Sequence, residues 1–158
     1  MPTDLQHMTH GNHNIDFLSH IYPTQFNDWI ITVAFYSSLH VFEYAIFKTK
    51  DLPYRGKKLQ VMHSKEFFPA IRTAGLPLPH NCTSKSSDHT ARKQIVNRIF
   101  PEVSGAYYRL SNDSHTARYE LYQQGRPKAE DRIRKDLVKI ITWSNTRYPT
   151  VFKQPTLA

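Results

Sequence analysis

Apolar residues recur at steps of three and four along most of this chain, which is the spacing of amphipathic helices. The longest such run predicts a helix over residues 28–48, with Asn27 as its N-cap. Ser37 and His40 lie on its apolar face, so His40 is either a hydrogen-bonded core residue or part of a site. The apolar members of that face are Trp29, Ile30, Val33, Val41, Tyr44 and Phe47. This helix should be central to the core.

The second half of the chain predicts further helices. One covers residues 88–100, with Ser87 or Asp88 as its cap, and a last amphipathic helix covers 128–145. Between them, residues 101–124 predict a helix, a polar turn at 111–113, and a second helix capped by Ser114. Arg109 and His115 are therefore expected to flank one turn. Residues 59–71 support at most a short helix.

No segment shows the alternation that is typical of strands, because the β-branched residues occur at helical spacing. We therefore predict an all-α fold, an up-down bundle of four to five helices. Residues 15–148 should form its single domain, after a polar N-terminal lead-in at 1–14 and before a frayed C-terminal tail at 149–158. A polar, proline-bearing loop at 75–87 has a length that is often functional.

The charge of the chain is strongly positive. Its 21 lysines and arginines against 13 acidic residues give a formal charge of +8 and a pI near 9.6. An anionic partner such as RNA is physically reasonable for such a chain. A solvated basic surface with no specific partner is the alternative.

Cysteine and histidine usage limits the chemistry. Cys82 is the only cysteine, which excludes an intramolecular disulfide and a cysteine-rich zinc site. His7, His10 and His13 recur every three residues, but no carboxylate or cysteine accompanies them at ligand spacing, so we expect no metal and no other cofactor. No stretch approaches ~20 apolar residues, and the N-terminal residues lack the pattern of a secretory signal. These features predict a cytoplasmic protein that does not associate with a membrane.

Three short motifs occur in a fixed order along the chain. The first is Asp-Trp at 28–29 followed by Tyr-Ser-Ser-Leu-His at 36–40 and by Ala45. The second is His-Thr-Ala-Arg at 89–92, and the third is Tyr-Arg-Leu at 108–110 leading to Ser-His-Thr-Ala-Arg-Tyr at 114–119. In this order they resemble the HEPN superfamily (higher eukaryotes and prokaryotes nucleotide-binding domain), in particular its small stand-alone prokaryotic members. The resemblance covers roughly residues 15–145 and implies a HEPN-like bundle.

The resemblance implies a function. Many members of the superfamily are metal-independent endoribonucleases that act as homodimers, and each subunit contributes an arginine followed, after four to six residues, by a histidine. Arg109 and His115, with five residues between them, fit this motif and are the expected catalytic residues. The expected substrate-binding residues are Arg118, Tyr119, Arg92, His89 and His40. The chain would then be a toxin or defence effector, with an antitoxin or a defence-system protein as its partner.

In such a ribonuclease a ribose 2′-hydroxyl attacks the adjacent phosphate. His115 would move protons, because an imidazole titrates near neutral pH. Arg109 would hold the phosphate through its planar fork and stabilise the charge that develops. Catalysis predicts that both residues are exposed in a groove at a two-fold interface.

The alternative is a non-catalytic HEPN-like module that binds a nucleotide or RNA, or regulates a partner protein. In that case Arg109 and Arg118 pair with nearby carboxylates or carbonyl groups. His40, His89 and Arg92 then form a polar cluster that orders the bundle. This alternative predicts that Arg109 and His115 are buried and bonded within the chain.

Overall fold

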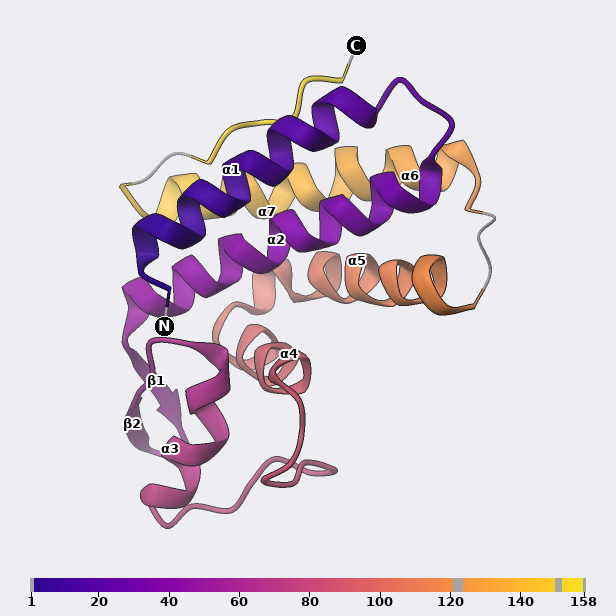
Figure 1. Cartoon of the computed structure of the whole chain (residues 1–158). Helices are drawn as coiled ribbons and strands as arrows, with labels where there is room; N and C mark the ends of the chain where they lie inside the picture. Colours follow the sequence, from indigo (N-terminus) through magenta and orange to yellow (C-terminus); the bar gives the residue numbers. More distant parts are fainter. Residues whose placement is uncertain (1, 121–123, 150–151, 158) are drawn as a thin grey trace.

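The computed structural model describes residues 2–120, 124–149 and 152–157, which form a helical bundle with a small hairpin at one end (Figure 1). The elements are α1 (Asp4–Ile21), α2 (Asn27–Thr49), β1 (Asp51–Tyr54), β2 (Lys57–Gln60), the 3₁₀ helix η1 (Ser64–Glu66), α3 (Phe67–Thr73), α4 (Asp88–Ile99), α5 (Pro101–Tyr119), α6 (Arg126–Asp131), the π-helix η2 (Arg132–Leu137) and α7 (Val138–Arg147). Since α6, η2 and α7 are continuous, the described ranges contain six helices, more than the four to five predicted. The chain is 69% helical, as the apolar spacing predicted.

The central element is α2. Its residues 30–35 and 41–46 are buried without a break, because a helix that is apolar on all sides is covered on all sides. Helices α1, α5 and α7 pack against it, and α1 runs beside it in Figure 1. The predicted bounds of 28–48 are confirmed, but Asn27 is the first residue of α2, and Phe26 occupies the cap position without a side-chain cap bond.

Helix α2 is also long and apolar enough to cross a membrane. Most of it is buried inside the fold, however, and the core helix of a globular protein passes the same test. Length and apolar composition therefore do not distinguish a membrane-spanning helix from a core helix here.

The hairpin β1–β2 corrects the prediction of a fold without strands. Leu52 pairs with Leu59, and both side chains are buried. Arg55 and Gly56 form the connection with φ values of 47° and 80°. Positive φ at both central residues is the geometry of the tight turns that join antiparallel strands. Each strand has only four residues, so the alternation was too short to detect in the sequence.

Helix α5 is continuous where the sequence predicted a turn. Residues 111–113 remain helical, so Ser114 caps no second helix. Asp113 instead forms ion pairs with Lys128 and Arg132 of the last helix. Tertiary partners thus satisfy the polar side chains that would otherwise compete with the helix for hydrogen bonds. Residues 121–123, the end of the predicted second helix, lie outside the described residues.

Both ends of the domain are packed. The predicted lead-in at 1–14 is mostly the first part of α1, whose N-cap Thr3 forms a capping box with Gln6. The tail that we expected to fray places Phe152 in the core, 1% exposed, against Gly11 of α1. The backbone of Phe152 also exchanges two hydrogen bonds with the side chain of Asn145.

Candidate functional site

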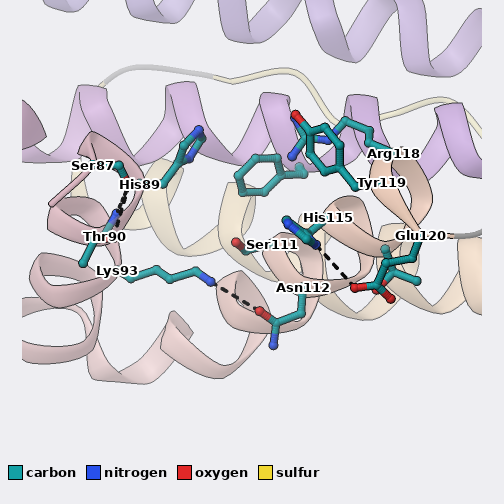
Figure 2. Close-up of a pocket in the computed structure, with 12 residues that line it drawn as sticks. Ser87, His89, Thr90, Lys93, Ser111, Asn112, His115, Arg118, Tyr119 and Glu120 are labelled. Carbon is teal, nitrogen blue, oxygen red and sulfur yellow. Dashed lines mark hydrogen bonds and ion pairs between the residues drawn. The ribbon is translucent and has the colours of Figure 1, made fainter. Parts of the chain in front are cut away.

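A groove of about 590 Å³ lies between α4 and the C-terminal half of α5, with Phe35 of α2 in its lining. Figure 2 shows His89 and Lys93 from α4 on one side, and His115 and Arg118 from α5 on the other. Among the described residues that line the groove, Glu120 is the only acidic one. The complete lining is Phe35, Ser87, His89, Thr90, Lys93, Ser111, Asn112, His115, Thr116, Arg118, Tyr119 and Glu120.

Arg118 is held in position at this groove by several contacts. Its Nε donates to the carbonyl of Ser114 over 3.1 Å, and its Nη1 donates to the hydroxyl of Tyr36 over 2.7 Å. The guanidinium also lies 5.0–5.9 Å from the ring centroids of Tyr119, Tyr36 and Phe35. A guanidinium fixed in this way loses little side-chain entropy when it binds an anion or stacks on a base.

The α4 side of the groove adds a second cation. Lys93 Nζ donates to Asn112 Oδ1 over 3.3 Å and lies 5.5 Å from the ring of Tyr108. Burial lowers the pKa of Lys93. Neither contact neutralises its charge, and within the described part of the chain no carboxylate forms an ion pair with it. Its charge is therefore available to an anion in the groove.

His89 joins the groove to the interior. Its Nδ1 accepts a hydrogen bond from Arg92 Nη1 over 3.3 Å, so the neutral ring carries its proton on Nε2. Burial, together with the nearby charges of Arg92 and Arg118, lowers the pKa of His89. His89 is therefore a neutral imidazole at pH 7.

His115 and Tyr119 form the open end of the groove. The side chain of His115 is 62% exposed, and its Nδ1 lies 3.6 Å from a carboxylate oxygen of Glu120. The ring of Tyr119 lies 5.0 Å from that of His115, and Tyr119 is 68% exposed. An imidazole and a phenol ring are thus both accessible to a ligand.

The structure does not place Arg109 in this groove. Six residues of helix turn the side chain of Arg109 by about 240° relative to that of His115, since each residue of an α-helix adds about 100°. Arg109 lies against the last helix, where its Nη2 is 2.5 Å from Asp136 Oδ1 and its Nε also donates to this carboxylate. Asp136 is fully buried and also accepts a hydrogen bond from Arg132. The expected turn would have brought Arg109 and His115 together, and the continuous helix separates them.

Two other predicted residues belong to a mostly buried polar cluster that does not line the groove. We use the name histidine–glutamate cluster for His7, His40, Glu43, His63 and Arg92. Arg92 Nε and Nη2 approach Glu43 Oε1 to 2.7 and 2.6 Å, and both residues are buried. Of the predicted substrate-binding residues, His89, Arg118 and Tyr119 line the groove, whereas His40 and Arg92 lie in the cluster.

No pattern in the sequence indicates that Glu43, His7 and His63 lie together. The available signal was Glu43, a carboxylate inside the apolar run that became α2, because a buried charge requires partners. Its partners come from α4 and from the segment before α3, so no local spacing could have indicated them.

Comparisons of the chain with protein-family models, with curated proteins and with solved structures found no match. The class of this protein is therefore described from its own fold and groove. It is a mostly helical protein with a groove lined by cationic and aromatic side chains. The HEPN resemblance remains a prediction.

Proposed function

We propose that this protein binds RNA with unpaired bases in the groove between α4 and α5. The observation that carries the proposal is the fixed guanidinium of Arg118, which lies among aromatic rings and faces a groove that also holds Lys93. Proteins recognise unpaired RNA by combining cations for the phosphates with aromatic or guanidinium planes for the bases. At about 590 Å³, the groove has room for a nucleotide-sized group.

The division of roles follows from the contacts. Lys93 offers a compact charge to a phosphate, while Tyr119, which is exposed, offers a face for base stacking. Phe35 makes part of the groove wall apolar. Glu120, the acidic residue at the open end, has a carboxylate oxygen 3.6 Å from His115 Nδ1.

The test is the salt dependence of binding to a labelled single-stranded RNA. Lys93→Gln should weaken binding about tenfold, the equivalent of one charge-assisted contact, and should lower the slope of log K against log salt by about 0.7. The matched control is Lys58→Gln, which removes the same charge from an exposed position on β2. Equal effects of both changes would contradict a specific groove and indicate a basic surface without a site.

A second candidate function is metal-independent RNA cleavage in the same groove. The observation that favours it is the accessible imidazole of His115 one helical turn before Arg118, with the neutral His89 on the other side. His115 would take the proton of the attacking 2′-hydroxyl while the bond from phosphorus to the 5′-oxygen breaks. That oxygen takes up a proton from water, His115 returns its own proton to the solvent, and the products are a cyclic phosphate and a 5′-hydroxyl. In this version Arg118, rather than Arg109, stabilises the phosphate.

Cleavage is tested by incubating labelled transfer and messenger RNA with the protein in EDTA. We expect His115→Ala to abolish cleavage and Arg109→Ala, if folded, to retain it. Loss of activity in both His115→Ala and a folded Arg109→Ala would instead favour the predicted Arg109–His115 pair. RNA that is retained but uncut by the parent protein supports binding without catalysis. Light scattering in the same experiments tests the expected homodimer. Three expectations stay predictions: the toxin or defence role, the partner protein and the cytoplasmic location.

A further inference from the structure

The histidine–glutamate cluster brings together three metal-ligating side chains from separate parts of the chain. His7 comes from α1, Glu43 from α2, and His63 immediately precedes η1. One ligand atom from each lies within 4.8 Å of the others, and all three residues are buried. A pocket of about 200 Å³ opens beside them. The N-terminal part of α1 runs beside α2 in Figure 1, which is how His7 reaches the other two.

Hydrogen bonds around the three residues direct their lone pairs toward one another. His63 Nε2 lies 2.7 Å from the carbonyl oxygen of Pro2, which can only accept, so Nε2 carries the proton. In the neutral ring, His63 Nδ1 is then a lone pair, and it faces His7 Nε2 at 3.3 Å and Glu43 Oε2 at 3.5 Å. A single proton can join only two of these three atoms, whereas a cation between them would satisfy all three.

The spacing suits a tetrahedral ion. Two ligands at about 2.0–2.1 Å from zinc in tetrahedral geometry lie about 3.3–3.4 Å apart. The distances from His63 Nδ1 to His7 Nε2 and to Glu43 Oε2, 3.3 and 3.5 Å, are close to this value, and the ligand atoms of all three residues lie within 4.8 Å of one another. The arrangement of two histidines and one glutamate is also a known donor set for zinc with one open position.

The surroundings supply the outer contacts that orient metal ligands. His7 Nδ1 lies 3.2 Å from His40 Nδ1, which can fix the ring with its Nε2 toward the site. Ser64 N–H donates to Glu43 Oε2 over 3.1 Å, and the Ser64 hydroxyl donates to Glu43 Oε1. Arg92 also holds Oε1, so a lone pair of Oε2 remains for an ion.

We propose that His7 Nε2, His63 Nδ1 and Glu43 Oε2 bind a divalent transition-metal ion, with zinc as the best fit. The pocket that these three residues line together with Lys65 and Asp88 has room for a fourth ligand. The positive charge of Arg92 cancels the negative charge of Glu43. The net charge of the metal site is therefore +2, the same as for an ion bound by three neutral histidines. Such an ion favours hydroxide or another anion as its fourth ligand.

The protonation of the ligands determines how metal binding would depend on pH. Burial lowers the pKa of His7 to about 4, so its ring is neutral and able to bind metal at pH 7. The contact with Glu43 raises the pKa of His63. Metal binding must therefore displace the proton wherever His63 is protonated, and affinity should increase with pH. The site is separate from the RNA groove, and the inference does not depend on the proposed function.

The experiment is a titration of the EDTA-treated, dialysed full chain with Co²⁺ and with Zn²⁺. We expect one Co²⁺ per chain with the visible absorption of a tetrahedral site, displacement by Zn²⁺, and a higher unfolding temperature with Zn²⁺. His7→Gln and His63→Gln should each weaken binding by at least ~100-fold. The matched control His13→Gln removes an exposed histidine of the same helix and should bind as the parent does.

Two results would overturn the proposal. One is an absence of one-to-one binding by the parent at millimolar Co²⁺ and Zn²⁺. The other is parent-like binding by both His7→Gln and His63→Gln. If circular dichroism shows that either variant is unfolded, histidine side-chain ¹⁵N spectra of the parent decide: zinc must shift two buried imidazoles and leave His115 unchanged.

Discussion

Acid should destabilise this protein mainly through buried imidazoles, and His7 allows the effect to be worked out. His7 is 5% exposed, and burial lowers its pKa from 6.5 to about 4. The ring faces His10 on α1, His40 and Glu43 on α2, His63 before η1 and Arg92 on α4. Of these, only Glu43 favours the protonated ring, and its effect is smaller than that of burial.

The sign follows from the protons that each state binds. Between pH 6.5 and 4 the unfolded chain protonates His7 and the folded chain does not, so stability falls as the pH decreases through this window. The two pKa values give a loss of about 2 kcal/mol at pH 5 relative to pH 8, and about 3 kcal/mol below pH 4. For a domain of this size, 2 kcal/mol corresponds to about 4–8 °C in Tm.

His63 acts in the opposite direction. Its contact with Glu43 raises its pKa, so its stabilising contribution is complete below pH 6.5 and is lost as the pH rises through the folded value. Burial alone would raise the pKa of Glu43, but His63, Arg92 and the hydrogen bonds from Ser64 hold it well below its usual range. Glu43 is therefore ionised in the folded protein at both pH 5 and pH 8. Its contribution to the free energy of unfolding is nearly the same at the two pH values and cancels when their stabilities are compared.

The assay is urea unfolding at pH 8 and pH 5 in EDTA, followed by circular dichroism. The loss of stability between the two pH values should be about 2 kcal/mol larger in the parent than in His7→Gln. The control His13→Gln, on the exposed side of α1, should behave as the parent does. Equal losses in the parent and in His7→Gln would refute the reasoning, because His7 would then be protonated equally in both states.

Three further changes test the packing and the role of Arg109. Gly11→Ala should destabilise by about 1 kcal/mol in urea unfolding, since the new Cβ would lie 2.8 Å from the Phe152 ring and overpacking outweighs the gain in helix propensity. Gly105→Ala is the control, because its Cβ has room, and it should stabilise by about 0.5–1 kcal/mol. Asp136→Asn should lower the free energy of unfolding by about 3 kcal/mol, because at a fully buried position it removes the charge partner of Arg109 and one of the two partners of Arg132. Arg109→Gln should lower the free energy of unfolding by about 1 kcal/mol, since the side chain of Arg109 is half exposed. The RNA affinity of this variant should equal that of Lys58→Gln.

The apolar spacing was sufficient to locate most helices, because the pattern that makes a helix amphipathic is local. The bounds of α2 agree with the prediction to within one residue at each end. Ser87, one of the two residues predicted as the cap of α4, is that cap and accepts a hydrogen bond from the backbone N–H of Thr90. Arg118 and Tyr119, two of the predicted substrate-binding residues, both line the groove, and their role there stays a prediction.

What the sequence could not determine depends on partners distant in the chain. Residues 111–113 read as a turn by their own preferences, but Asp113 finds Lys128 and Arg132 in the last helix, and α5 continues through them. That single difference turns Arg109 away from His115 and toward the buried Asp136. The histidine–glutamate cluster joins residues 33 and 56 positions apart, so no spacing motif could reveal it. Local spacing determines which face of a helix is apolar, whereas the cost of burying a charge without a partner determines which distant side chains must meet.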